Sequence, residues 1–71
     1  MNPLTQEWVD KAEGDFATAK REFEATFEPN FDAVCFHSQQ RVEKYLKACL
    51  HEANVEAPRT HDLVTLMDLL P

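Results

Sequence analysis

The chain has few of the residues that make turns. Only one glycine and four prolines occur among its 71 residues, and the prolines stand near the expected ends of segments. Because glycine and proline punctuate short strands and tight turns, their scarcity favours a few long helices over many short strands. The lone glycine also excludes a glycine-rich loop of the kind that cradles phosphates.

Long apolar runs are absent too. No stretch of about 18 apolar residues occurs, and no basic segment precedes an apolar one at the N-terminus. With 44% hydrophobic residues, however, the chain is too apolar to remain disordered. We therefore expect a folded protein of the cytoplasm that does not enter a membrane.

Positive charge is scarce. Seven Lys and Arg face 13 Asp and Glu, and the net charge of −6 argues against a simple nucleic-acid binder. The imbalance is uneven: residues 1–30 carry three basic and seven acidic groups, whereas residues 31–55 carry three of each. The excess of acidic residues is therefore concentrated in residues 1–30, and residues 31–55 carry no net charge.

Residues 31–53 form the central predicted helix. On a helical wheel its apolar residues fill roughly 200°, about twice what a surface helix needs, so apolar neighbours are expected on at least two sides. The remaining arc is basic, and within about 120° it holds five side chains: His37, Arg41, Lys44, Lys47 and His51.

Two further helices flank this one. Asn2 and Pro3 predict an N-cap and first position for a helix reaching Phe27, and Asn30 predicts the cap of the central helix. Thr60 is the predicted cap of a third helix with an apolar side made of Leu63, Leu66, Met67, Leu69 and Leu70. Short connections favour antiparallel packing, so we expect an all-α, up-and-down antiparallel bundle of three helices in one domain, residues 1–71.

Several polar or reactive residues border the apolar arcs. Asp15 lies beside the apolar stripe of the first helix and needs a cationic or N–H partner from a neighbouring helix. Gln39 falls within the apolar arc of the second helix and predicts a buried polar cluster. Cys35 and Cys49, about 21 Å apart along that helix, cannot join in one chain and are expected to be buried thiols.

The candidate ligand site is the basic stripe of Arg41, Lys44 and Lys47, whose side chains suit phosphate groups. The alternative interpretation is a solvated face, or one paired with the acidic first helix of another subunit. Arg59 and His61 make a second cationic corner, where His61 would donate to a buried carboxylate or contact a phosphate. Histidine spacing favours no metal site, no catalytic constellation is present, and no cofactor is expected.

Together these motifs resemble a known family. The order is W-x3-A-x2-D-F-x2-A in Trp8–Ala19, F-D-x2-C-F-H-x-Q-Q-x2-E-K-Y-L-K-A-x-L in Phe31–Leu50 and P-R-T-H-D-L-x2-L in Pro58–Leu66. This pattern is similar to the HEPN domain, named for higher eukaryotes and prokaryotes nucleotide-binding, and it covers nearly the whole chain.

The resemblance implies a helical bundle of four or five helices, usually a homodimer. It also implies a minimal nucleotidyltransferase as a partner, in pairs that can behave as toxin and antitoxin. Family members are commonly longer, so this chain resembles a HEPN domain without its C-terminal helices. The ribonuclease branches carry an Arg-x4-6-His motif, and no His occurs at this spacing after Arg21, Arg41 or Arg59.

Three hypotheses follow. The first is a non-catalytic HEPN module that dimerises and binds a nucleotidyltransferase partner or a nucleotide. The alternative is a HEPN ribonuclease toxin that cleaves RNA at a dimer interface, and the third is a purely structural helical assembly. Under each, the apolar faces exceed what three helices can cover, which predicts a dimer or larger assembly.

Overall fold

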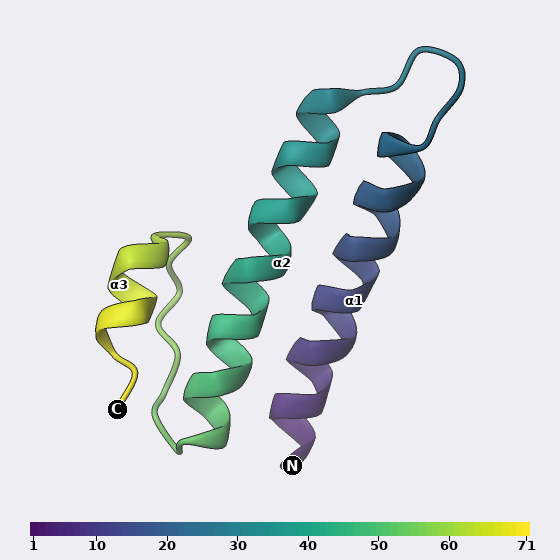
Figure 1. The fold of residues 1–71 in the computed structure, drawn as a ribbon. Helices are drawn as coiled ribbons and strands as arrows, with labels where there is room; N and C mark the ends of the chain where they lie inside the picture. Colours follow the sequence, from purple (N-terminus) through teal and green to yellow (C-terminus); the bar gives the residue numbers. More distant parts are fainter.

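The computed structural model describes residues 1–71 and contains three helices and no strand. Helix α1 spans Pro3–Phe23, α2 spans Phe31–Glu52 and α3 spans Leu63–Asp68. Helices α1 and α2 run antiparallel, and α3 packs on α2 alone, so α2 is the middle element (Figure 1). The molecule is elongated, 44 × 23 × 16 Å. The predicted all-α bundle of three helices is confirmed.

The linker before α3 changes the direction of the last helix. After α2 ends, the chain runs back along α2, and α3 then descends in the same direction as α2 (Figure 1). The antiparallel relation therefore holds between α1 and α2. That residues 1–71 form a single domain stays a prediction.

Helix α1 begins as predicted but ends four residues early. The Asn2 side chain accepts a hydrogen bond from the Thr5 backbone N–H at 2.8 Å, and Pro3 occupies the first turn. The prediction that the helix reaches Phe27 is wrong, because the chain must turn back toward α2. Glu28 adopts a positive φ of 45°, and the Glu22 carboxylate accepts a hydrogen bond from the Asn30 N–H at 2.6 Å.

Both ends of α2 follow from local side chains. The Asn30 side chain accepts a hydrogen bond from the Ala33 N–H at 3.0 Å, which is the predicted cap. At the other end Asn54 takes a positive φ of 60°, and the Val55 N–H donates to the Leu50 carbonyl at 2.8 Å. This left-handed residue and its backbone bonds form a Schellman motif, which satisfies the last carbonyls of the helix.

Helix α3 is shorter than predicted, and its cap is a different residue. Asp62 is the N-cap, and its carboxylate accepts hydrogen bonds from the Val64 N–H and the Thr65 hydroxyl, both at 3.0 Å. Thr60, the predicted cap, instead accepts a hydrogen bond from the Asp62 N–H at 3.1 Å. Thr60 thus shapes the turn before the helix, and the carboxylate of Asp62 takes the capping role.

The buried core is thin and consists mostly of small residues. Only nine of 71 residues are buried, and the apolar ones are Ala12, Ala19, Ala48, Leu50 and Leu66. Alanines at the α1–α2 contact let the two backbones approach closely, and they bury little apolar area. Large apolar side chains consequently remain outside, among them Phe23, 64% exposed, and Phe36, 58% exposed.

Two predictions about α2 are wrong. Cys35 and Cys49 are exposed rather than buried, and Gln39 is exposed as well. The cause is the orientation of α2: its polar and basic side faces α1, and much of its wide apolar arc faces solvent. Gln39 therefore needs no buried polar cluster.

Candidate functional site

The basic stripe of α2 points into the molecule rather than outward. Lys44 pairs with Asp15 of α1, Arg41 lies over Phe16 of α1, and Lys47 is buried. Neither of the predicted alternatives, a solvated face or pairing with another subunit's first helix, describes this stripe. It pairs mostly with residues of its own chain, which neutralise or cover its charges.

The first polar cluster joins α1 to α2 through Asp15. One carboxylate oxygen contacts His37 Nδ1 at 2.8 Å, and the other accepts a hydrogen bond from Lys44 Nζ. Asp15 is only 8% exposed. Burial by itself raises the pKa of Asp15, but hydrogen bonds from Lys44 and His37, with their charges, hold this pKa below its usual value. The expected interhelical partner of Asp15 is confirmed.

Arg41 is held by aromatic rings. Its guanidinium carbon lies 4.1 Å from the centroid of the Phe16 ring and 5.3 Å from that of Tyr45. The Tyr45 hydroxyl in turn donates to Glu13 of α1. Arg41 Nε is buried and meets no acceptor. A planar cation stacked in this way is fixed in position while part of its hydrogen-bonding capacity stays unused.

The second polar cluster is centred on Glu43, whose side chain is 2% exposed. Lys47 Nζ lies 3.4 Å from Glu43 Oε2, and His61 Nδ1 lies 2.8 Å from Glu43 Oε1. A buried carboxylate requires such partners, because an unpaired one is strongly disfavoured. Of the two roles open to His61, the structure shows the contact with a buried carboxylate.

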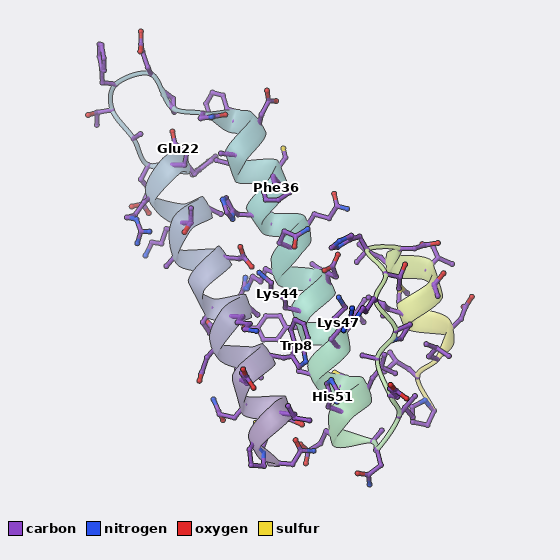
Figure 2. All side chains as sticks on the ribbon, turned by 180° about the vertical axis from the view of Figure 1, so that it is seen from behind. Trp8, Glu22, Phe36, Lys44, Lys47 and His51 are labelled. Carbon is purple, nitrogen blue, oxygen red and sulfur yellow. The ribbon has the colours of Figure 1, made fainter.

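Trp8 completes the polar contact between the first two helices. Lys47 Nζ lies 5.1 Å from the centroid of the Trp8 ring, and the His51 ring stacks on Trp8 with centroids 6.3 Å apart. Figure 2 shows Lys44, Lys47 and His51 along the C-terminal half of α2, with Trp8 beside them. The α1–α2 interface is thus built from alanines, ion pairs and cation–π contacts.

The five predicted ligand residues do not converge on one site. Arg41 and Lys44 contact α1, whereas Lys47 and His61 share the Glu43 carboxylate. Arg59 is exposed and makes no hydrogen bond or ion pair. Of the five, Arg41 and Arg59 are therefore the two without a carboxylate partner. Their role in binding phosphate stays a prediction.

A groove of about 370 Å³ opens between α1 and α2 beside Arg41. Its lining is mainly apolar, and its two cations are Lys20 and Arg41. The full set of lining residues is Phe16, Ala19, Lys20, Phe23, Val34, Ser38, Arg41 and Val42. An apolar floor with two positive side chains at its walls fits a flat, anionic or amphipathic ligand.

Two residues of these arrangements were missed by reasoning from sequence. Glu43 sits on the helical wheel between Leu50 and Phe36, inside the apolar arc, and this position could have marked it as a buried carboxylate. Lys20 carries no such signal, because it lies on an acidic helix and its place beside the groove depends on how α1 meets α2.

Other classes of site find little support. No three His, Cys, Asp or Glu side chains converge as metal ligands would. None of the three helices combines the length and apolar character that crossing a bilayer requires. The expected cytoplasmic location stays a prediction.

The helices, the paired carboxylates and the T-H-D-L turn at the start of α3 agree with the motifs quoted above. The model of the HEPN domain family matches residues 5–71. The chain belongs to the HEPN domain family. This membership places it among helical modules of the nucleotide-binding or ribonuclease type. No curated protein and no solved structure matches the chain.

Proposed function

We propose that this HEPN chain is a non-catalytic module that dimerises and binds a partner protein of the minimal nucleotidyltransferase class, in a toxin–antitoxin-like pair. The observation that carries the proposal is that the usual distribution of charged and apolar side chains between interior and surface is partly reversed. Charged residues that would bind or react are paired inside the molecule, while large apolar side chains lie outside. Surfaces of that kind are typical of protein interfaces.

The exposed area supports association. The chain exposes 5036 Å², whereas a compact monomer of 8.2 kDa exposes about 4,500 Å². Twelve large hydrophobic side chains are at least 36% exposed. A protein partner would bury this surface and gain the hydrophobic free energy that the thin core does not supply.

The side chains also argue for a module without catalysis. His37 and His61, which could act as a base, each hold a structural carboxylate. No arginine of the chain is followed by a histidine at the spacing of the ribonuclease branches. The alternative function, an RNA-cleaving HEPN toxin with its active groups at a dimer interface, lacks these groups among residues 1–71.

A nucleotide is the second candidate ligand, and the groove beside Arg41 favours it. Phe16 and Phe23 offer apolar rings for a base, and Lys20 and Arg41 offer positive charge for phosphates. The net charge of −6 opposes strong binding of longer nucleic acid, whose affinity depends on neutralising many phosphates.

Co-expression tests the main proposal. The chain is co-expressed and purified with a protein of the minimal nucleotidyltransferase class, and the complex is measured by size exclusion and calorimetry. A stable complex, together with no cleavage of a fluorescent single-stranded RNA, supports the proposal. RNA turnover that disappears in Arg59→Ala or His61→Ala would establish the ribonuclease instead. Absence of binding to the partner and to a panel of nucleoside triphosphates would leave only the structural assembly.

A further inference from the structure

The turn between α1 and α2 holds the most exposed large hydrophobic residue of the chain. Phe27, within this turn, is 81% exposed. Phe23, the last residue of α1, and Phe31, the first of α2, are also mostly exposed. Residues 23–32, named here the turn tip, lie at the end of the molecule away from α3 and the C-terminus (Figure 1). Exposed apolar side chains that gather in this way mark binding surfaces.

Each phenylalanine of the turn tip is followed directly by an acidic residue. The three pairs are Phe23-Glu24, Phe27-Glu28 and Phe31-Asp32, and the three carboxylates are exposed. When Glu22 is counted as well, residues 22–40 hold four acidic residues and no lysine or arginine. The turn tip therefore combines an exposed aromatic side chain with negative charge of one sign.

The turn tip is ordered without a partner. The Glu22 carboxylate accepts a hydrogen bond from the Asn30 N–H at 2.6 Å, which closes the turn, and the Asn30 side chain caps α2. Glu28, the residue after Phe27, has a φ of 45°, a left-handed conformation that is unfavourable for residues other than glycine. Backbone held in this conformation concentrates at ligand-binding sites. A turn that is already ordered also loses little freedom when it binds.

Charge decides which kind of partner fits the turn tip. A turn with an exposed aromatic ring could enter a bilayer, but its carboxylates are repelled by the negative surface of anionic membranes. Nucleic acid is opposed for the same reason, because its binding depends on neutralising phosphates. The turn tips of two copies would repel each other, and Lys44 and Lys47 are already paired with carboxylates of their own chain. The fitting partner is therefore a different protein with a basic surface.

We propose that the turn tip is the surface that contacts the nucleotidyltransferase, and that this partner meets it with an apolar pocket bordered by lysine and arginine side chains. The inference rests on the proposed function and specifies the surface of the chain and the chemistry of the partner's surface. Phe27 enters the pocket, and the carboxylates of Glu24 and Glu28 pair with the basic side chains at its border.

The aromatic ring and the carboxylates have different roles in this contact. Because Phe27 is almost fully exposed, burying its ring gains hydrophobic free energy without breaking a contact within the chain. Glu24 and Glu28 belong to no ion pair of the chain, so their charges are free to meet the partner. A buried aromatic side chain at the centre holds a complex together, whereas charges at the border mainly raise the association rate.

Calorimetric titration of the chain with a purified protein of the minimal nucleotidyltransferase class tests the role of Phe27. Phe27→Ser should weaken the complex about thirtyfold, the effect of truncating a central aromatic side chain. Val64→Ser is the matched control, since Val64 is 65% exposed on α3, away from the turn tip, and its affinity should stay nearly unchanged. Circular dichroism of both variants checks that the helices persist, so that weaker binding cannot be confused with unfolding.

Neutralising the carboxylates tests the charge of the partner's surface. Glu24→Gln/Glu28→Gln should weaken the complex about tenfold at low salt and less at high salt, because salt screens the charges at the border of an interface. Glu7→Gln/Asp10→Asn is the control and removes the same number of charges from α1. These two positions lie roughly 20 Å or more from the turn tip along the helix, beyond the reach of exposed charges in salt, so the affinity should change little.

The outcomes separate this inference from the proposed function. Equal affinities of Phe27→Ser and the parent chain, or a tighter complex in Glu24→Gln/Glu28→Gln, overturn the turn tip as the contact but leave the binding of the nucleotidyltransferase intact. A complex that does not form at all overturns both. Sedimentation with vesicles of phosphatidylcholine and phosphatidylserine should leave the chain in the supernatant. Sedimentation with the vesicles that is lost in Phe27→Ser would make the turn tip a membrane anchor and overturn the inference.

Discussion

Glu43 and His61 form the only side-chain hydrogen bond between α2 and the segment that carries α3. The distance from His61 Nδ1 to Glu43 Oε1 is 2.8 Å, and Glu43 is almost wholly buried although His61 is mostly exposed. Leu66 is the one buried residue of α3. The position of the last helix thus depends on one hydrogen bond and one leucine, which makes α3 the least firmly held element of the fold.

The first prediction concerns this hydrogen bond. His61→Ala leaves Glu43 with Lys47 as its only partner, and losing a bond to a buried carboxylate is worth about 1–3 kcal/mol. We expect hydrogen exchange of the amides in α3 to accelerate about tenfold or more, because 1.4 kcal/mol is a factor of ten. The helical signal of α1 and α2 should persist. Arg59→Ala, which removes an exposed side chain without partners, is the control, and equal exchange in both variants would contradict the prediction.

A second prediction follows from the Asp15 cluster. Asp15→Asn removes the charge that faces Lys44 and His37, and breaking a buried pair destabilises by about 3 kcal/mol or more. Urea unfolding at neutral pH should show this loss of unfolding free energy. Asp10→Asn changes an exposed carboxylate of the same helix and should have little effect.

The same cluster predicts how stability depends on pH. The folded pKa of Asp15 lies below its ordinary value of 3.8, so the unfolded chain binds the proton more readily. The stabilisation is therefore complete above that value and is lost as the pH falls through the lower folded pKa. The loss between neutral and acid pH should be smaller in Asp15→Asn than in the parent chain, and an identical loss would count against the cluster.

The contrast between α1 and α2 shows how far sequence reasoning reaches. Helix starts at Asn2 and Asn30 follow from local capping chemistry, and Asp15 was expected to need a cation because a carboxylate beside an apolar stripe must be paired. The orientation of α2 could not be predicted, because its wide apolar arc suggested burial. Carboxylates and aromatic rings of α1 contact the basic side of α2 instead. Which side of α2 faces α1 therefore depends on the sequences of both helices.

The error about the cysteines has the same origin. Cys35 and Cys49 lie in the apolar arc, and a thiol there is commonly buried. Burial requires an element to cover that arc, and α3 covers only the part near Leu50. Residues such as Phe36 and Val42 stay exposed for the same reason, and no periodicity within α2 could have indicated which part of its arc would remain open.

Another prediction compares the two asparagine caps. Replacing either Asn2 or Asn30 by alanine should reduce the unfolding free energy by about 1 kcal/mol. Asn2 also donates through Nδ2 to the His51 carbonyl at 3.1 Å, tying the start of α1 to the end of α2. The loss of unfolding free energy should therefore be about 1 kcal/mol larger in Asn2→Ala than in Asn30→Ala. Denaturant melts of the two variants under the same conditions measure the difference, and equal values would show that the bond to His51 contributes nothing.

The last prediction separates the basic residues by their partners. Lys44 and Lys47 are bound to carboxylates of the chain, so Lys44→Met and Lys47→Met should reduce stability and leave nucleotide affinity nearly unchanged. Lys20→Ala and Arg41→Ala should instead weaken the binding of ATP about tenfold each, because each removes a charge-assisted contact at the groove.

Arg41→Lys refines this comparison. It keeps the charge but loses the planar stacking on Phe16, so its affinity for ATP should fall between those of the parent chain and Arg41→Ala. Calorimetric titration with ATP, and thermal melts of the same samples, give the two readouts independently. The opposite result would be a loss of ATP affinity in Lys44→Met and Lys47→Met but not in Lys20→Ala and Arg41→Ala. The ion pairs of Lys44 and Lys47 would then have to open on binding, and the groove would not be the nucleotide site.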